Sequence, residues 1–306
     1  MNLSSPSEIA RIMRKHKVAP KRRFGQNFLT DANTLSRIVA AGDLKAGDQV
    51  IEVGTGLGVL THALANVVGP TGKVLTFEVD TSLVPALVET LAGLSQVELL
   101  VGDAMEADLS AIRAANLDIS KTITVVANIP YNITTPLLIK MLEHKAWIRG
   151  IVFLVQREVA NRLIAKAGTS DYGALSVFAQ YHSTVEFVAP VSRRVFVPAP
   201  DVESAIVRLL PKADSPFPDI DESLFFGIVR ASFGQRRKNL LNSLSGDPKL
   251  AWTREQAASA LAGSGIDPGR RGETLNLDEF AQIARHAMPA VAPLSETASR
   301  EIPLEL

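Results

Sequence analysis

The strongest chemical signal in this sequence is the segment Asn128-Ile129-Pro130-Tyr131. The side chain of Asn128 and the backbone of Ile129 each offer a carbonyl oxygen, and the fixed φ of Pro130 keeps the segment rigid. Two acceptors that converge on an exocyclic amine would hold its lone pair toward an electrophile. Tyr131 adds a flat face on which a nucleobase can stack. The segment could also be a turn beside a core tyrosine, but its residue types indicate chemistry on a base amino group.

A turn rich in glycine, from Glu52 to Gly58, is the second signal, because glycine lets a backbone take positive φ and approach a ligand closely. Its spacing, E-x-G-x-G-x-G, differs from the G-x-G-x-x-G/A fingerprint of nicotinamide dinucleotide sites. Val59 stands where that fingerprint needs its last small residue. A lone turn of this kind is often only a tight connection between a strand and a helix, so the surrounding residues decide its meaning.

Two acidic residues follow the next two predicted strands. Glu78 closes the strand that begins at Lys73, and Asp103 follows the strand that begins at Val97. A carboxylate at the end of the second strand can accept hydrogen bonds from both hydroxyls of a ribose, and one after the third strand can receive an adenine amine. Each acid alone could instead cap a helix or lie in a solvated turn. Together with the glycine turn, they predict a nucleoside site at the carboxyl ends of the strands.

Alternating strands and helices must position these residues. Seven runs rich in Val, Ile and Leu are predicted strands: 49–53, 73–79, 97–101, 122–128, 150–156, 184–191 and 204–210. Helical patterns fill the gaps at 59–68, 135–143, 158–167 and 173–181. The first five strands are almost continuously apolar, as expected of parallel strands covered on both faces, whereas no strong helix separates the last two. The predicted fold is a doubly wound α/β sheet, mostly parallel, with antiparallel strands at its edge.

The pattern changes after Pro211. Residues 213–223 are rich in Pro, Asp and Ser, which is typical of a linker, and the later helical patterns fall at 224–233, 238–243, 254–262 and 277–286. We therefore expect four parts in the chain. They are a basic N-terminal segment at 1–30, a sheet domain at 31–211, a small all-helical domain at 212–287 and a disordered tail at 288–306.

Composition excludes several classes of function. None of the 306 residues is cysteine, which excludes a disulfide scaffold, thiolate zinc sites and cysteine catalysis. No apolar run approaches the roughly 18 to 20 residues of a membrane helix, and the N-terminus lacks the apolar core of a secretory signal. We therefore expect a cytoplasmic protein with no membrane partner. The chain has 32 Lys and Arg residues and 32 Asp and Glu residues, so its formal net charge is zero. Seven basic residues nevertheless lie between positions 11 and 23. A surface that binds phosphate groups is therefore compatible with the neutral net charge.

Taken together, these motifs resemble those of the ribosomal RNA adenine dimethyltransferases. The segment from Asn128 to Tyr131 is similar to the N/D-P-P-Y motif of N6-adenine methyltransferases, and the glycine turn resembles the first motif of enzymes that use S-adenosylmethionine. Three further segments match the family in order: Phe24–Leu29, Phe196–Ser204 and Phe233–Lys238, the last reading FGQRRK. The resemblance covers about Lys21 to Ala287. It implies a Rossmann-like methyltransferase sheet that uses S-adenosylmethionine, followed by a small helical domain that binds rRNA.

Carried over residue by residue, the resemblance implies a donor site without a metal. The residues implied for the donor are Asn27, Leu29, Gly54, Gly56, Glu78, Asp103 and Asn128. Glu78 would bind the ribose of S-adenosylmethionine and Asp103 its adenine. Asn27 and Leu29 would contact the methionine end, with Gly54 beneath it.

The resemblance also implies a reacting centre and an RNA site. Asn128 would touch the target amine as well as the donor, beside Ile129 and Pro130. Tyr131 and Phe196 would pack on the two faces of an adenine that has left its stack. The basic residues implied for rRNA binding are Arg236, Arg237 and Lys238.

The implied reaction is attack of adenine N6 on a sulfonium methyl group, twice on each of two adjacent adenines in a loop near the 3′ end of small-subunit (16S) rRNA. The partner would be the immature small subunit, and the enzyme would be a monomer. FGQRRK favours this substrate, because relatives that methylate large-subunit rRNA and confer macrolide resistance share only the sheet motifs. Methylation of large-subunit rRNA or DNA, and a mainly non-catalytic role in ribosome assembly, stay open as alternatives. Thr55 stands where the family commonly has proline, and the neutral net charge departs from its usual basic character.

Overall fold

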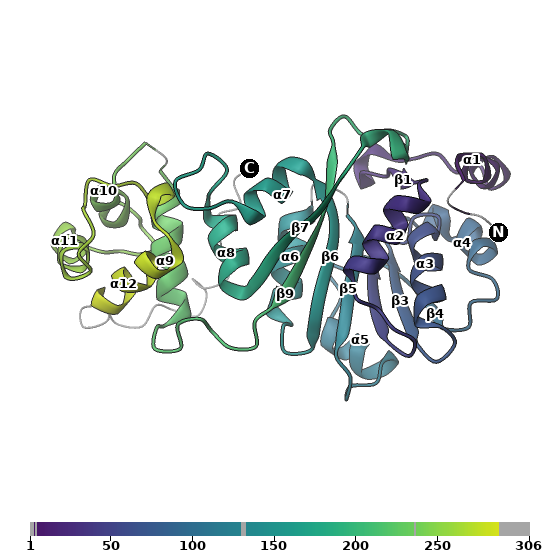
Figure 1. Ribbon diagram of the computed structural model, residues 1–306, viewed down its shortest axis with the longest axis horizontal. Helices are drawn as coiled ribbons and strands as arrows, with labels where there is room; N and C mark the ends of the chain where they lie inside the picture. Colours follow the sequence, from purple (N-terminus) through teal and green to yellow (C-terminus); the bar gives the residue numbers. More distant parts are fainter. Residues whose placement is uncertain (1–2, 4, 130–132, 236, 288–306) are drawn as a thin grey trace. The chain divides into compact units, whose positions relative to one another are not determined.

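The computed structural model describes residues 3, 5–129, 133–235 and 237–287 (Figure 1). Within these ranges the main sheet has seven strands in the order β4-β3-β2-β5-β6-β9-β7. The strands are β2 (Gln49–Val53), β3 (Lys73–Glu78), β4 (Val97–Val101), β5 (Ile123–Asn128), β6 (Ile148–Gln156), β7 (Ser183–Val191) and β9 (Ser204–Pro211). The pairs among β2 to β6 are parallel, and β9 pairs with β6 in the antiparallel direction. The predicted α/β sheet is confirmed.

The order of the strands reverses beside β2. The chain runs outward from β2 through β3 to β4, and then returns to place β5 on the other side of β2. The register pairs Val53 with Phe77 and with Ala127, so the carboxyl ends of the three strands lie at the same edge. A reversal of this kind opens a crevice outside the strand ends, which is where such sheets bind ligands.

Helices connect the strands of the sheet. They are α2 (Ala32–Ala41), α3 (Val59–Val68), α4 (Val84–Thr90), α5 (Leu109–Asn116), α6 (Thr134–Glu143) and α7 (Arg157–Ile164). Helix α3 begins and ends where the pattern predicts, and its buried face includes Leu60, Leu64 and Val68. The sequence did not predict α2, α4 and α5. Asp31 and Asp108 cap α2 and α5, so these short helices start at side-chain caps that the hydrophobic pattern does not include.

The N-terminal segment belongs to the sheet unit. Helix α1 (Pro6–Lys15) buries Ile9 and Ile12 in the same core as the sheet helices. Further along, β1 (Phe28–Leu29) pairs with β8 (Phe196–Val197) as a two-stranded antiparallel ribbon. Phe28 and Phe196, which lie 168 positions apart in two of the family motifs, are therefore on paired strands.

The described chain forms two compact units. The first contains the chain up to Ala160 together with Val185–Pro211, and the second contains Asn161–Thr184 together with the chain from Lys212. The helices of the second unit are α8 (Ala174–His182), α9 (Glu222–Phe233), α10 (Leu240–Ser245), α11 (Arg254–Gly263) and α12 (Leu277–Ala287). None of the helices in the described ranges is long and apolar enough to cross a membrane. The expected disordered tail at 288–306 lies outside the described residues.

The interpretation of residues 213–223 as a linker is wrong. Phe217 is buried in the second unit, where its ring lies 6.1 Å from Tyr181 and 5.8 Å from Phe225, measured between centroids. Tyr181 also packs against Phe226 at 4.9 Å. These aromatic contacts explain why residues 161–184 group with the later helices. A single domain boundary at 212 would instead have placed them with the sheet. Aromatic pairs of this kind bury much apolar area.

Candidate active site

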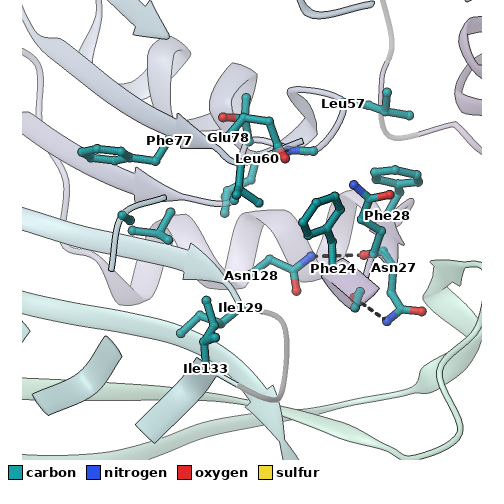
Figure 2. A pocket seen from close by; sticks show the side chains of 18 of the residues that line it. Phe24, Asn27, Phe28, Leu57, Leu60, Phe77, Glu78, Asn128, Ile129 and Ile133 are labelled. Atoms are coloured by element: carbon teal, nitrogen blue, oxygen red, sulfur yellow. Dashed lines mark hydrogen bonds between the residues drawn. The ribbon is translucent and has the colours of Figure 1, made fainter. Parts of the chain in front are cut away.

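A pocket lies at the carboxyl ends of β2, β3 and β5, within the first unit (Figure 2). Eight residues singled out from the sequence line it together: Asn27, Leu29, Gly54, Gly56, Glu78, Asp103, Asn128 and Ile129. They come from five separate segments of the chain, and the strand order brings the ends of β2, β3 and β5 to one edge of the sheet. Within the described residues, no cluster of His, Asp or Glu side chains could hold a metal ion.

The glycine turn forms the floor of the pocket. Gly54 and Gly56 have φ angles of +87° and +58°, a conformation that residues with a side chain rarely adopt. A Cβ on Gly56 would lie 3.3 Å from the ring of Phe28, and one on Gly54 would lie 3.4 Å from the backbone oxygen of Asn128. Glycine therefore satisfies the backbone conformation and also lets β1 and the end of β5 approach the turn.

Glu78 is held in place by two backbone N–H groups. The amide of Gly56 donates to Oε2 at 2.8 Å, and the amide of Asp80 donates to Oε1 at 2.9 Å. The side chain is largely buried, and this burial raises the pKa of Glu78, although the two N–H donors partly oppose the effect. Each carboxylate oxygen has further lone pairs that can accept hydrogen bonds from ligand hydroxyls.

Asp103 lies on an exposed turn after β4. Its Oδ1 accepts a hydrogen bond from the backbone N–H of Met105 at 2.8 Å, and the residue also lines the pocket. The helix that follows, α5, is capped by Asp108 instead. Asp103 therefore stabilises a turn that lines the pocket, and it does not cap a helix.

Asn128 connects the end of β5 to the N-terminal motif. Its Nδ2 donates to the backbone oxygen of Asn27 at 3.3 Å, and the amide oxygen points away from Asn27 (Figure 2). Pairing with β6 continues one residue further, because Ile129 N–H donates to the carbonyl of Leu154. The side chain of Asn128 thus has one fixed donor and an acceptor that can face a ligand. This is the arrangement that orientation of an amine requires.

Not every residue singled out from the sequence lines this pocket. Phe196 pairs with Leu29 through the backbone, is only 4% exposed and does not line this pocket. Arg237 and Lys238 are exposed residues of the second unit. Pro130, Tyr131 and Arg236 lie outside the described residues.

Other pocket residues were not singled out individually. Apolar side chains cover much of the lining, among them Phe24, Phe28, Phe77 and Ile133 (Figure 2). Phe24 and Phe28 belong to the FGQNFL motif, which could have indicated them. Phe77 and Ile133 carry no distinguishing signal, because they read as ordinary strand and loop residues.

Beneath the glycine turn, Glu52 is a buried carboxyl group. It is 0% exposed, and its Oε2 accepts hydrogen bonds from the hydroxyls of Thr61 at 2.6 Å and Thr76 at 2.7 Å. Its Oε1 has no hydrogen-bond partner among the described residues. Burial raises the pKa of Glu52 to about 8, despite the opposing hydrogen bonds from the two threonines.

This raised pKa predicts a pH-dependent stability. The unfolded chain releases the Glu52 proton near its ordinary value of 4.5, whereas the folded chain keeps it to about pH 8. The stabilising contribution is therefore fully present below pH 4.5, and it is lost by about 1.4 kcal/mol per pH unit as the pH rises toward 8. Glu52→Gln should remove this slope, which urea unfolding between pH 5 and 8 would measure. Glu98→Gln, which removes a partly exposed carboxylate beside Lys73, is the matched control. Equal slopes in Glu52→Gln and the parent chain would show that Glu52 is ionised when folded.

Comparison with known proteins gives consistent matches. A model of the family described as "Ribosomal RNA adenine dimethylase" matches residues 18–287. The chain is 42% identical over 289 residues to "Ribosomal RNA small subunit methyltransferase A" of Geobacillus thermodenitrificans, an alignment that covers 94% of this chain and 98% of the relative. It is 44% identical over 287 residues to the protein of the same name from Bacillus mycoides, covering 92% and 96%.

Two solved structures share the fold. A dimethyladenosine transferase from Plasmodium falciparum is 24% identical with a TM-score of 0.69, over 84% of this chain and 95% of that one. The 23S rRNA methyltransferase ErmE is 27% identical with a TM-score of 0.63, over 86% and 100%.

Proposed function

The chain belongs to the ribosomal RNA adenine dimethylase family and is therefore an rRNA adenine dimethyltransferase, and we propose that it uses S-adenosylmethionine to dimethylate small-subunit rRNA. The target we propose is N6 of two adjacent adenines in a loop near the 3′ end of that RNA. The observation that carries this proposal is the single pocket that joins Glu78, the glycine turn and Asn128.

The residues present fit S-adenosylmethionine, which would supply an electrophilic methyl group on a sulfonium. Gly54 and Gly56 line the pocket and have no side chain, so a ligand can approach their backbone closely. In our proposal, Glu78 accepts hydrogen bonds from the ribose hydroxyls, and Asp103 accepts one from the adenine amine. Asn27 and the neighbouring Leu29 would enclose the methionine end.

Asn128 orients the target amine in this proposal. Because its nitrogen is used by Asn27, its oxygen is the end that can accept a hydrogen from adenine N6. Such an acceptor keeps the nitrogen lone pair directed at the methyl group and stabilises the positive charge that develops on N6. Holding the reactants in line can supply up to about 7–11 kcal/mol of the barrier reduction. The roles of Ile129, Pro130 and Tyr131 at this centre rest on the family resemblance.

We propose small-subunit rRNA as the substrate because the relatives at 42–44% identity carry that activity in their names. The structural neighbour named for 23S rRNA is only 27% identical. The FGQRRK motif points the same way. In this proposal the second unit binds rRNA through Arg237 and Lys238, while a monomer acts on immature small subunits in the cytoplasm.

Incubation with both ribosomal subunits tests this proposal. Purified protein and methyl-labelled S-adenosylmethionine would be added separately to unmethylated small subunits and to large subunits. Label is expected only in small-subunit rRNA, and fully methylated small subunits should accept none. Label in the large subunit would move the protein to the macrolide-resistance group. No label in either, with tight binding to small subunits, would mean that assembly and not methylation is the activity of this chain.

A further inference from the structure

We propose that Asp80 is a positioning residue that fixes the N-terminal wall of the donor pocket. This wall is the side of the pocket that Phe24, Gln26 and Asn27 line. Asp80 lies two residues after Glu78 and precedes the 3₁₀ helix Thr81–Leu83. Its side chain is only 2% exposed, although it carries a carboxylate. The inference rests on the proposed use of S-adenosylmethionine, since it concerns the affinity for that donor.

Asp80 binds the N-terminal segment through both of its oxygens. Lys21 Nζ donates to Oδ1 at 2.7 Å, and Gln26 Nε2 donates to Oδ2 at 2.8 Å. The backbone N–H of Lys21 also donates to Gln26 Oε1 at 2.8 Å. These three hydrogen bonds form a closed ring, and Lys21 Nζ also donates to Ser82 Oγ at 2.6 Å, so the loop between Lys21 and Gln26 is anchored on the segment that follows β3.

That loop and the residues after it form one side of the pocket. Phe24, Gln26 and Asn27 all line it, and Asn27 receives the hydrogen bond from Asn128. The position of Asn27 is therefore set from two directions. Asp80 fixes the preceding residue, Gln26, while Asn128 holds the backbone oxygen of Asn27 itself.

The backbone of Asp80 connects this wall to the proposed ribose site. Its N–H donates to Glu78 Oε1, and the other oxygen of Glu78 accepts from Gly56. One residue thus links the N-terminal wall, the carboxylate of β3 and the glycine turn. Loss of the Asp80 side chain should loosen the wall while the other two parts keep their contacts.

The Asp80 carboxylate stays ionised at any working pH. Burial acts to raise its pKa, but Lys21, Ser82 and Gln26 outweigh this effect and lower it to about 2. The anchor is therefore a permanent feature of the folded protein rather than a pH-controlled one.

Glu89 offers a matched control. It also contacts the N-terminal segment through side-chain nitrogens, with Lys15 Nζ at 2.7 Å and His16 Nε2 at 2.6 Å. Arg11 is a third partner of Glu89. None of these described partners lines the pocket. If acidic anchors served only the stability of the N-terminal segment, loss of Glu89 and loss of Asp80 would have the same consequences.

The test compares Asp80→Ala, Lys21→Ala, the double variant and Glu89→Ala in the full-length protein. Calorimetry gives the Kd for S-adenosylmethionine, and methylation of small subunits gives KM and kcat. Asp80→Ala should raise the Kd and the KM for S-adenosylmethionine about tenfold or more, with kcat at saturating donor within about twofold. The double variant should be no worse than Asp80→Ala, because both changes break the same ring. Glu89→Ala should leave the Kd unchanged.

A second measurement keeps the test decisive if Asp80→Ala folds poorly. Asp80→Asn keeps one carbonyl acceptor, and amide hydrogen exchange should rise in residues 21–29 of this variant but not in Glu89→Ala. An unchanged Kd in a folded Asp80 variant, or the same rise in Glu89→Ala, would overturn the inference. If the parent chain binds no S-adenosylmethionine, the proposed donor is wrong instead.

Discussion

Replacing Asn128 with alanine is expected to lower kcat by about 100-fold to 1,000-fold, with the Kd for S-adenosylmethionine changed by no more than about threefold. The reason is that the amide oxygen of Asn128 is the acceptor that can orient the target amine, while the donor keeps its contacts with Glu78 and the glycine turn. Single-turnover methylation of small subunits, with the donor bound beforehand, measures this loss directly.

Two comparisons distinguish catalysis from folding. Asn116→Ala removes another asparagine whose Nδ2 donates to a backbone carbonyl, that of Ile112, and neither residue lines the pocket. It should leave kcat unchanged. Asn128→Asp keeps an acceptor but places a second oxygen against the carbonyl of Asn27, so its kcat should fall between those of the parent and the alanine variant. A parent-like rate in Asn128→Ala would remove this residue from the reacting centre.

The second large effect that we expect is a loss of affinity for S-adenosylmethionine when Glu78 is replaced. Glu78→Ala should raise the Kd for S-adenosylmethionine by about 100-fold or more, because two hydrogen bonds to a charged carboxylate are lost. The same change leaves the N–H groups of Gly56 and Asp80 without their acceptor, which should loosen the turn. Calorimetry measures the Kd, and Glu106→Gln removes an exposed carboxylate outside the lining as a control. Equal affinity in Glu78→Ala would place the ribose elsewhere.

Glu78 also predicts how donor affinity varies with pH. Burial raises its pKa, so the carboxylate takes up a proton at a higher pH than an ordinary glutamate does. A protonated Glu78 accepts fewer hydrogen bonds, and the affinity for S-adenosylmethionine should therefore fall as the pH is lowered toward that pKa. This fall should be absent in Glu78→Ala. A donor affinity that is flat at mildly acidic pH would contradict the proposed role.

The sheet and its ligand-binding edge could be predicted because both follow from local patterns. The strand at Gln49–Val53 and the helix at Val59–Val68 have the predicted bounds. Both are continuously apolar or periodic, and glycines mark where each of them ends. Strand order at the reversal then brings Glu78 and Asp103 to one edge. The residue types at these ends were sufficient to predict that Glu78, Asp103 and Asn128 share the pocket, whereas Phe77 and Ile133, which also line it, carry no such signal.

Features that depend on contacts distant in sequence could not be predicted. Nothing local in the sequence shows that Asp80 binds Lys21 and Gln26, which precede it by more than fifty positions. The same holds for Phe217, whose Pro-rich surroundings are typical of a linker but whose ring packs on Tyr181. Phe196 illustrates a further limit, because the family motif that contains it does not reveal that the ring is covered in this structure.

The most direct test of the central claim is nucleoside mass spectrometry of small-subunit rRNA methylated by this protein. Unmethylated small subunits would be incubated with S-adenosylmethionine and either the parent chain or Asn128→Ala, and the rRNA then digested to nucleosides. N6,N6-dimethyladenosine is expected with the parent chain and should be absent with the variant over the same time. Equal amounts of dimethyladenosine from both proteins would contradict the claim that this pocket orients the target amine.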